Sequence, residues 1–370
     1  MRILHLTGDR EDMGGILSVI RNVQTASAGR GWQHSVLVHQ VYRETRLPRL
    51  DYRHTRHGCA DLPNHFAILA RASLMTLEVS RLLAGEHFDV IHAHTRGSLF
   101  VVMALAAIQR RRVIFTNHSY ARRVQLYGRA ARLRNFHTVL LTPNMVRHYG
   151  LAESFPKVSI IPDCCADRFF SEPLVTRRNR AGGEPLHLAG VGNIMRWKNW
   201  HLLARAMRRL TDDERNRIRF SLWGPRPSDP DSVAYEKELR HLVASLGLES
   251  QFLFCGMSNS VGECLRKADW MVLPSTNEPC SVALSEALAL GVPVLASASG
   301  GNVDIVRPGR TGVLFKPDDH EDLAAKLRDL LAARVTPVPP AEIRESVREL
   351  SAARVTEKFS RLYDQVTRGR

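Results

Sequence analysis

The residues best suited to chemistry stand in a short segment, residues 277–286, which reads N-E-P-C-S-V-A-L-S-E. Two carboxylates, Glu278 and Glu286, lie eight positions apart in it. A helix is predicted to begin between them, because residues 282–290 are strong helix formers and Gly291 is a natural stop. Glu278 is therefore expected on the loop before the helix, and Glu286 one turn inside it.

The start of this helix is expected to bind an anion. Backbone amides in the first turn of a helix have no partner within it, so they bind phosphate well. The amides concerned belong to Cys280, Ser281 and Val282. A carboxylate beside a phosphate site is unfavourable by itself, and it makes sense if Glu278 serves a sugar hydroxyl or a developing positive charge. The alternative is that Glu278 caps the helix and Glu286 is solvated.

Strand and helix patterns alternate along the chain in two series, which predicts an α/β protein with two doubly wound parallel sheets. The first series has predicted strands at 2–7, 34–39, 89–92, 113–116, 139–142 and 158–161 and helices at 14–28, 66–83 and 99–108. The second has strands at 186–192, 218–223, 252–254, 270–274 and 293–296, and a last helix is predicted from 341 to about 367. The polar segment 172–184 between the series is the predicted linker. Ligands of such sheets bind beyond the carboxyl ends of the strands, so loops that follow strands are where the chemistry is expected.

Composition and cysteine usage exclude several classes of protein. The chain has 370 residues, 44% hydrophobic and 24% charged, which is a globular balance for about two domains. The longest apolar run, residues 99–108, is shorter than the roughly 20 residues of a membrane span, and the N-terminus lacks a signal-peptide pattern. Six cysteines without a C-x-x-C pair predict reduced thiols in the cytoplasm, and no spacing of a zinc site is present.

Positive charge is concentrated in the first half of the chain. The net charge is +15, and residues 1–165 hold 22 basic and 11 acidic residues. Arginines cluster at 110–112 and 122–134. A basic domain suits an anionic membrane surface or an acidic substrate, and a merely solvated surface is the alternative. Nucleic acid is not expected as a partner, because only 7% of residues are aromatic and the arginine clusters lack interleaved rings that stack bases.

The segment that begins at Glu278 resembles the retaining glycosyltransferases of family four, which have the GT-B fold. Their signature is an acidic residue, seven others, a glutamate, a helix and G-x-P-V, and this chain reads E-P-C-S-V-A-L-S-E-A-L-A-L-G-V-P-V. The resemblance extends over nearly the whole chain. It implies two Rossmann-like domains that face a cleft, an acceptor-binding domain at 1–172 and a nucleotide-sugar-binding domain at 184–349. The helix at about 350–370 would pack back onto the first domain.

The resemblance points to further residues on loops after strands. Gly14 and Gly15 match a glycine pair after the first strand, where the lack of a Cβ lets a phosphate or sugar approach the backbone. Gly256 and Met257 match the loop whose backbone holds the nucleotide base. His118, in F-T-N-H-S, matches a histidine that faces the donor sugar. His92 and His94, in I-H-A-H, end the previous strand and rank below it.

Two departures from the family pattern concern the donor site. Where the family shows V-G-R-x-x-x-x-K-G, this chain keeps Lys198 but has Asn193 for the arginine and Asn199 for the glycine. The arginine and lysine normally clamp the diphosphate, and Arg196 is the candidate replacement because a guanidinium fork suits phosphate. The second departure is Asp163, in I-I-P-D, which is interpreted as structural.

The resemblance implies a retaining, metal-independent glycosyltransferase that needs no cofactor. Its donor would be a nucleotide-diphosphate sugar, a UDP-sugar first of all, and its acceptor a hydroxyl of a glycan, glycolipid or phosphate-bearing molecule in cell-envelope polysaccharide or glycoconjugate synthesis. Lys198, Arg196 and the helix amides would stabilise the leaving diphosphate, since no D-x-D marks a magnesium site. Glu278 would position the donor sugar or offset oxocarbenium charge, and Glu286 would hold the ribose.

The protein is expected in the cytoplasm or at the inner face of the membrane. The alternative function is a GT-B relative that binds a nucleotide sugar without transferring it, which Asn193 favours.

Overall fold

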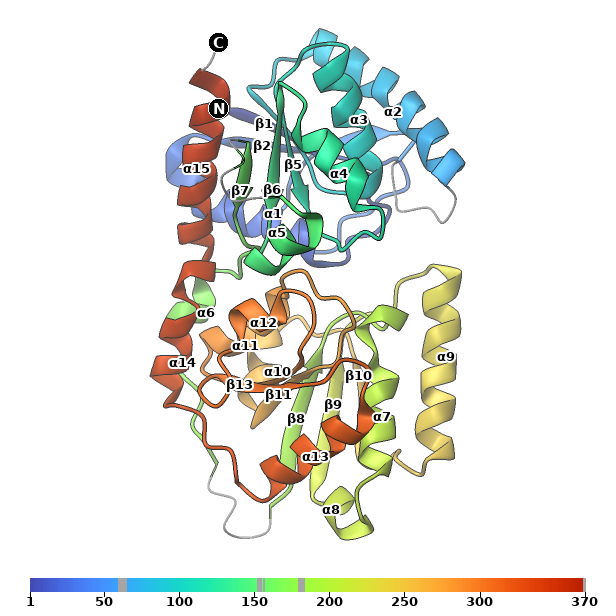
Figure 1. Cartoon of the computed structure of the whole chain (residues 1–370), viewed down its shortest axis with the longest axis vertical. Helices are drawn as coiled ribbons and strands as arrows, with labels where there is room; N and C mark the ends of the chain where they lie inside the picture. Colours follow the sequence, from blue (N-terminus) through green and yellow to red (C-terminus); the bar gives the residue numbers. More distant parts are fainter. Residues whose placement is uncertain (59–64, 152–154, 156, 179–183, 369–370) are drawn as a thin grey trace. The chain divides into compact units, whose positions relative to one another are not determined.

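The chain forms two compact units, each built on a parallel sheet, in a computed structural model that describes residues 1–58, 65–151, 155, 157–178 and 184–368 (Figure 1). The first unit comprises Met1–Cys164 together with Ala352–Arg370, and the second comprises Cys165–Ser351. Residues 179–183 of the expected linker lie outside the described residues. The α/β architecture with two Rossmann-like sheets is therefore as predicted.

The first unit has a seven-stranded parallel sheet in the order β3-β2-β1-β4-β5-β6-β7. Its strands are β1 (Arg2–Leu6), β2 (Gln33–His39), β3 (Asp51–Thr55), β4 (Val90–Ala93), β5 (Val113–Asn117), β6 (Phe136–Leu140) and β7 (Val158–Ile160). Helices on its faces are α1 (Gly15–Ala26), α2 (His65–Gly85), α3 (Arg96–Ala107), α4 (Val124–Ala131), α5 (Pro143–Tyr149) and α15 (Ala352–Arg368). Strand β3 was not predicted, because D-Y-R-H-T has no apolar run and pairs on one side only, at the sheet edge.

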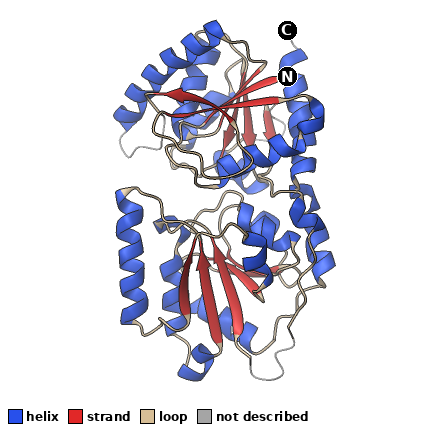
Figure 2. Cartoon of the chain, turned by 180° about the vertical axis from the view of Figure 1, so that it is seen from behind, coloured by secondary structure: helices blue, strands red, loops and turns tan. Residues whose placement is uncertain are grey.

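The second unit has a six-stranded sheet in the order β10-β9-β8-β11-β12-β13 (Figure 2). Its strands are β8 (Leu186–Val191), β9 (Ile218–Trp223), β10 (Phe252–Gly256), β11 (Trp270–Leu273), β12 (Val294–Ser297) and β13 (Gly312–Phe315). Its helices are α6 (Arg168–Ser171), α7 (Trp200–Arg208), α8 (Asp212–Asn216), α9 (Pro230–Ser245), α10 (Val261–Arg266), α11 (Val282–Ala289), α12 (Asn302–Ile305), α13 (His320–Leu331) and α14 (Pro340–Ser346). Both sheets pair in parallel throughout, as the alternation of strands and helices predicted.

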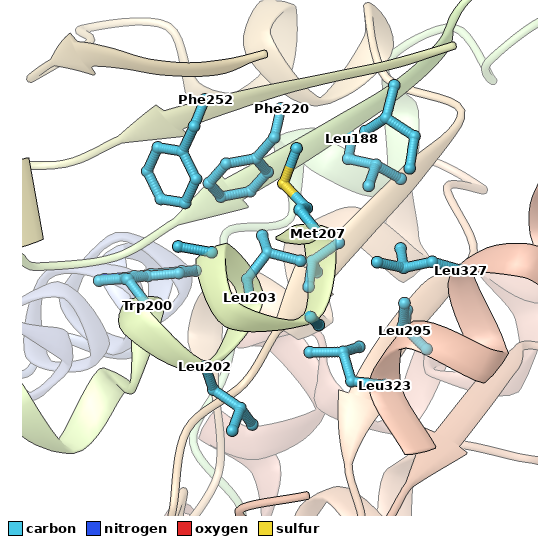
Figure 3. Close-up of a cluster of buried hydrophobic side chains, with 14 of the residues drawn as sticks. Leu188, Trp200, Leu202, Leu203, Met207, Phe220, Phe252, Leu295, Leu323 and Leu327 are labelled. Carbon is cyan, nitrogen blue, oxygen red and sulfur yellow. The ribbon is translucent and has the colours of Figure 1, made fainter. Parts of the chain in front are cut away.

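One buried cluster in the second unit positions the start of α7 (Figure 3). The Trp200 side chain is fully buried, and its ring packs beside that of Phe220. A Cβ at Gly190 would lie 2.6 Å from Phe220 and 2.8 Å from Trp200, so strand β8 needs glycine at this position. Trp200 also donates from its indole Nε1 to the Asn193 backbone oxygen at 3.1 Å. The tryptophan thereby fixes the turn that precedes α7.

The last predicted helix, 341–367, is wrong as a single element. Helix α14 ends at Ser346, a short 3-10 turn covers Arg348–Leu350, and α15 begins at Ala352. The interruption has a structural cause, because Ser351 is extended, with φ −68° and ψ 148°, and forms an isolated bridge with Cys165. Only α15 belongs to the first unit, where it packs on α1 and β4.

The division between the units also differs from the expected boundaries. It falls after Cys164 and before Ala352, whereas the sequence suggested residues 172–184 and 349–350. The reason is that the segment after Cys164 is part of the second core. Phe169 of α6 is 1% exposed and packs in the same cluster as Leu284 of α11. The described part of the polar segment, residues 172–178, therefore belongs to the second unit.

The buried histidines of the first unit include those at positions 5, 34, 92, 94 and 137, in or directly after strands of its sheet. Burial lowers the pKa of His34 and of His137 from 6.5 to about 4. Burial, with the charge of neighbouring histidines, lowers the pKa of His5, His92 and His94 well below 6.5. The folded first unit therefore favours the neutral form of all five rings.

Acid should destabilise the first unit in the pH range set by these histidines. In the unfolded chain their pKa values return to about 6.5, so the folded state binds fewer protons below that pH. Their stabilising contribution is complete above about pH 6.5 and is lost as the pH falls towards about 4, with a slope of up to ~1.4 kcal/mol per pH unit for each ring. Urea unfolding followed by circular dichroism at pH 7.5, 6 and 5 measures this slope. An unfolding free energy that stays constant over this range would contradict it.

Candidate active site

A buried ion pair joins two loops at the carboxyl edge of the second sheet. Lys198 donates from Nζ to Oε2 of Glu278 at 2.7 Å, and the side chains are 11% and 7% exposed. The Lys198 ammonium also lies 4.3 Å from the ring centre of Trp197. These two residues come from positions 80 apart in the sequence, after β8 and after β11 respectively. The structure therefore brings together two charged residues that the sequence analysis placed at the donor site.

The loop after β8 is shaped so that Lys198 turns inward. Arg196–Lys198 form a 3-10 turn, and Asn199 follows with φ 59° in the left-handed region. Asparagine tolerates this conformation better than most residues, which explains how it replaces the glycine of the family pattern. The Asn199 side chain is also held, because Nδ2 donates to Asp318 at 2.8 Å. This departure from the pattern leaves the local backbone intact.

The loop that carries Glu278 is held by its own backbone. The Glu278 carbonyl accepts from the Gly301 amide at 2.7 Å, and a Cβ at Gly300 would lie 2.2 Å from the same oxygen. Gly300 has φ 58°, so both its conformation and its space require glycine. On the other side, the Thr276 amide donates to the Trp197 carbonyl at 3.0 Å. The glycines at 300–301 and the hydrogen bond to the Trp197 carbonyl therefore hold the Glu278 backbone in place at the carboxyl edge of the sheet.

Helix α11 begins directly after this loop. Ser281 is its N-cap, and the Ser281 hydroxyl oxygen accepts from the Leu284 amide at 3.2 Å. Within the described part of the chain, no hydrogen bond engages the amides of Ser281 and Val282 as donors. The Cys280 side chain is buried, and Glu286 is half-buried in the second turn of the helix. The helix start thus has the form expected of an anion site.

Two of the expected donor residues lie differently from the Lys198–Glu278 pair. The Arg196 guanidinium donates to Glu238 at 2.9 and 3.1 Å and to Asp231 at 3.4 Å, and the hydrogen bond to Glu238 raises its pKa. Its side chain is 48% exposed. The Asn193 side chain donates from Nδ2 to the sulfur of Met195 at 3.9 Å. In this state Arg196 is directed to α9 rather than to Lys198.

Gly256 is the last residue of β10 and Met257 follows it, at the same edge of the second sheet. Gly256 has φ 71°, which favours glycine, and its carbonyl accepts from the Gly224 amide at 2.8 Å. Met257 is 56% exposed. A backbone turn with an exposed side chain is compatible with the expected contact to a base through main-chain atoms.

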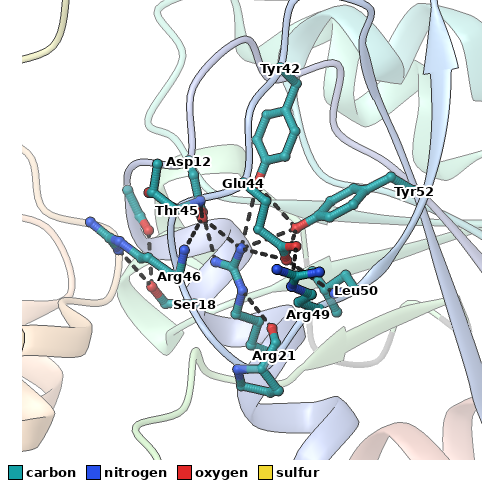
Figure 4. Close-up of polar contacts among 12 residues, drawn as sticks. Asp12, Ser18, Arg21, Tyr42, Glu44, Thr45, Arg46, Arg49, Leu50 and Tyr52 are labelled. Atoms are coloured by element: carbon teal, nitrogen blue, oxygen red, sulfur yellow. Dashed lines mark hydrogen bonds and ion pairs between the residues drawn. The ribbon is translucent and has the colours of Figure 1, made fainter.

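In the first unit, Gly14 and Gly15 stand at the start of α1 as expected. Gly14 has φ 92° and is the N-cap, and a Cβ built there would meet nothing within 4 Å. The loop before it is anchored by Asp12. The carboxylate of Asp12 accepts hydrogen bonds from both terminal nitrogens of Arg21, at 2.8 and 2.9 Å (Figure 4). Burial alone would raise the Asp12 pKa, but hydrogen bonds from Arg21 and the amides of Thr45 and Arg46 lower it. The sequence analysis missed this anchor.

His118 follows β5 and has polar partners on both ring nitrogens. Its Nδ1 lies 3.2 Å from Oδ2 of Asp163, and its Nε2 lies 3.2 Å from Nδ1 of His94. Its side chain is 8% exposed. Asp163, which the sequence analysis interpreted as structural, therefore belongs to the surroundings of His118. The available signal was its place three residues after a strand, at the same sheet edge.

The first unit also gathers the buried imidazoles of His5, His92 and His94, whose ring nitrogens lie within 4.8 Å of one another. Each of these nitrogens already has a hydrogen-bond partner. His5 contacts His94 and His34, His94 contacts His5 and His118, and His92 contacts Thr116 and Tyr363. Hydrogen bonding therefore accounts for this cluster without an ion.

Two family models match the chain, one for each half. Residues 13–163 match the model described as Glycosyltransferase Family 4, and residues 176–349 match that described as Glycosyl transferases group 1. D-inositol 3-phosphate glycosyltransferase of Geodermatophilus obscurus is 34% identical over 199 residues, which are 51% of this chain and 43% of that protein. 2-deoxystreptamine N-acetyl-D-glucosaminyltransferase of Niallia circulans is 24% identical over 381 residues, or 94% of each chain. The match to the first of these relatives spans less than half of its length.

Solved structures of glycosyltransferases share the fold. Sucrose-phosphate synthase from Thermosynechococcus elongatus aligns over 100% of both chains with a TM-score of 0.82 and 21% identity. HepE of Anabaena in complex with UDP-glucose aligns over 99% of this chain and 100% of its own, with a TM-score of 0.74 and 16% identity. These likenesses assign the GT-B fold to this chain.

Breaking the Lys198–Glu278 pair on one side should be strongly destabilising. Lys198→Met leaves a buried carboxylate without its partner, which costs about 3–5 kcal/mol of unfolding free energy. The double variant Lys198→Met/Glu278→Leu removes both charges and should recover most of that loss. Urea unfolding at pH 7 compares them.

The exposed pair Arg310–Glu342, with side chains 61% and 55% exposed, serves as the control. Arg310→Met should cost about 1 kcal/mol or less. If Lys198→Met is as stable as the double variant, an unpaired Glu278 carboxylate does not destabilise the fold, and the prediction is wrong.

Proposed function

Because this chain belongs to the family 4 glycosyltransferases, we propose that it transfers a sugar from a nucleotide-diphosphate sugar to a hydroxyl acceptor and retains the anomeric configuration. The observation that supports this most directly is the buried Lys198–Glu278 pair beside the start of α11. A cation and a set of helix amides suit a diphosphate, and a carboxylate suits a sugar. A UDP-sugar is the proposed donor, since HepE of Anabaena has been crystallised with UDP-glucose.

In this proposal the second unit binds the donor. Lys198 and the amides at 280–282 stabilise the negative charge that develops on the leaving diphosphate. Glu278 positions the donor sugar or offsets oxocarbenium charge, and Glu286 accepts from the ribose hydroxyls. Gly256 and Met257 contact the base. Arg196 contributes only if it leaves Glu238, which an exposed ion pair permits at small cost.

In the first unit, Gly14, Gly15 and His118 are the proposed contacts for sugar and phosphate groups. The left-handed Gly14 has open space where a Cβ would stand, so a ligand can approach its backbone closely. His118 lies at the carboxyl edge of the sheet, where open α/β sheets bind ligands.

The reaction is proposed to need no metal ion, because fixed cationic and amide groups take the place of magnesium at the diphosphate. Transfer should therefore continue in excess EDTA at an unchanged rate. Loss of transfer in EDTA that added magnesium or manganese restores would contradict this part of the proposal.

The two carboxylates should affect different kinetic constants. Glu278→Gln should lower kcat by about 10²–10³ with little change in donor KM, because its interaction strengthens with charge in the transition state. Glu286→Ala should raise donor KM by about 10–100-fold, the value of hydrogen bonds to a charged group. Initial rates with varied UDP-sugar measure both, and Glu342→Ala is the control. Unchanged constants in both variants would remove the proposed site.

The second candidate function is a protein that binds a nucleotide sugar without transferring it. The absence of an arginine at Asn193 and the engagement of Arg196 with Glu238 favour it. Release of UDP from UDP-sugars in the absence of acceptor separates the two, since a binding protein releases none. A screen of nucleotide sugars by thermal shift identifies the donor for either case.

The acceptor is proposed to be a glycan or lipid-linked molecule of cell-envelope synthesis, met by the first unit at the cytoplasmic face of a membrane. None of the helices within the described residues has both the length and the apolar character needed to span a bilayer. The first unit does expose apolar and basic side chains. Leu74 and Leu77 of α2 are 43% and 57% exposed. Arg110, Arg111 and Arg112, which follow α3, line a pocket with Phe88 and Val366.

Binding to anionic vesicles should test this membrane contact. At low salt the protein should sediment with phosphatidylglycerol vesicles and not with phosphatidylcholine vesicles, because each basic residue near the surface contributes about 1 kcal/mol. The variants Arg110→Gln/Arg111→Gln and Leu74→Ser/Leu77→Ser should each weaken it, whereas Leu253→Ser in the second unit should not. Equal partitioning on both lipids at low and high salt would contradict the proposed contact with an anionic membrane.

A further inference from the structure

A continuous row of hydrogen-bonded imidazoles crosses the sheet of the first unit. His34 Nδ1 lies 3.0 Å from His5 Nε2, and His5 Nδ1 lies 3.0 Å from His94 Nε2. The row continues from His94 Nδ1 to His118 Nε2 at 3.2 Å, and from His118 Nδ1 to Asp163 Oδ2 at 3.2 Å. Each of the four rings uses both of its nitrogens within the row or at its ends.

The parallel sheet explains why the rings line up. His34 is in β2, His5 in β1, His94 directly after β4 and His118 directly after β5, and these strands are neighbours in the order β2-β1-β4-β5. Each step from one ring to the next moves to the adjacent strand. Asp163 follows β7, and it closes the row at the carboxyl edge of the sheet. Ser27, after α1, closes the other end, with Oγ 3.0 Å from His34 Nε2.

Counting hydrogens along the row leaves two consistent arrangements. A neutral imidazole has one N–H, so it donates at one nitrogen and accepts at the other. An ionised Asp163 only accepts, so His118 donates from Nδ1, and His94, His5 and His34 must then each donate from Nδ1 in turn. The Ser27 hydroxyl donates to His34 Nε2 at the far end of this first arrangement.

The second arrangement contains one more proton. The Ser27 hydroxyl also lies 3.0 Å from the Gln24 carbonyl, and it has only one hydrogen to give. When that hydrogen goes to Gln24, His34 must donate from Nε2, and each following ring must also donate from Nε2. His118 then carries hydrogen on both nitrogens and is a cation that donates to Asp163.

We propose that Asp163, His118, His94, His5 and His34 form one proton relay, in which the groups at its two ends set the tautomer of every ring and a single added proton converts His118 into a cation paired with Asp163. The conversion begins when the Ser27 hydroxyl turns to the Gln24 carbonyl and His34 Nε2 takes up a proton that comes from solvent. Each ring then breaks its Nδ1–H bond and the next ring forms an Nε2–H bond, until His118 holds both hydrogens. No oxidant, reductant or further reactant is involved. His94, His5 and His34 are thus positioning residues that act through His118.

The surroundings favour a charge at the Asp163 end only. Burial and the charge of neighbouring histidines lower the pKa of His5 and His94, and burial lowers the pKa of His34 to about 4, so the interior rings resist a lasting charge. Described groups in contact with the row include His92 of β4, which is hydrogen-bonded to Thr116 of β5 and Tyr363 of α15, the ring of Trp32, and Ser27. At the His118 end, Asp163 supplies the carboxylate that stabilises a cation.

Four buried imidazoles in one row cost more than aliphatic side chains of similar size would. A buried polar group is tolerable when fully hydrogen-bonded, but an apolar replacement is often as stable or more so. Most other side chains of β1 and β4 that face the interior are aliphatic, among them Ile3, Leu4, Val90 and Ile91. The cost of burying these imidazoles therefore indicates a role other than packing. The row acts through His118, which is a proposed donor contact. This consequence rests on the proposed function, whereas the relay itself does not.

The direct test is nitrogen-15 NMR of the full chain labelled at histidine ring nitrogens, with assignment by single His→Gln variants. At about pH 7.5 the four rings should all carry hydrogen on Nδ1, or all on Nε2 with a doubly protonated His118. From the first arrangement, acidification short of unfolding should change all four tautomers together at one pH, and from the second arrangement a rise in pH should do so. A mixture of Nδ1–H and Nε2–H rings, or four separate transitions, would overturn the proposal.

Variants with a matched control extend the test to activity. His5→Phe removes the middle of the row, and His5→Gln keeps a donor and an acceptor there but cannot pass a proton, which covers the case in which the phenylalanine variant does not fold. His137→Phe is the control, since His137 is buried in β6 and contacts Ser159 outside the row. Both His5 variants should shift the His118 transition by about 1 pH unit, a tenfold change in proton affinity. The acid limb of the kcat profile should move with it, and His137→Phe should move neither.

The outcomes for the relay and for the proposed function are separable. If no nucleotide sugar is turned over while the rings change tautomer together, the proposed function fails and the relay stands. If transfer is normal while the rings titrate independently, or while His5→Gln and His137→Phe give the same pH profile, the relay fails and the function stands.

Discussion

The buried contact between the Lys198 ammonium and the Glu278 carboxylate is the constraint around which the second unit is arranged. Removing two charges from water costs several kcal/mol per ion, and their attraction repays this only with good geometry. That geometry requires a left-handed residue at 199, glycine at 300 because no Cβ fits beside the Glu278 carbonyl, and the indole of Trp200 to hold the turn. An ion pair of this kind is weak grounds for stability and stronger grounds for a site that receives charged groups.

The same reasoning distinguishes Lys198 from Arg196. Both side chains stand in the loop after β8, but Lys198 is buried against a single carboxylate, whereas Arg196 is held at the surface by Glu238 and Asp231. A surface pair exchanges its partners at small cost, so Arg196 is free to move in energetic terms. A buried lysine exchanges its carboxylate only for another anion. A diphosphate is such an anion, and the helix start at Ser281 offers it further donors.

Much of this fold could be predicted from sequence, because strands buried on both faces read as short apolar runs and the helices between them show a helical period. Strands β1, β2 and β8 were predictable for this reason, and β9 was predictable from its alternation of buried apolar residues with less buried ones. Strand β3 was not, since an edge strand can be polar. Helix α13 had a usable signal in its N-cap, where Asp319 accepts from the amides of Glu321 and Asp322. The break between α14 and α15 had none, because its cause is the bridge from Ser351 to Cys165.

The residues of the site also fall into two groups. Some could be found from their spacing along the sequence, and others only from contacts between distant segments. Glu278 and the helix start lie within ten residues, and Lys198 lies at a fixed distance from its strand, so a linear pattern contains them. The partners of His118 cannot be found in that way, because Asp163 is 45 positions away and His94 is 24 positions away. Only the order of strands in the sheet makes them neighbours, because β4 lies beside β5 and β7 lies two strands from it. A histidine or aspartate that follows a strand therefore gains its meaning when the strand order is known, since adjacent strands align their carboxyl ends and place such side chains within hydrogen-bond reach.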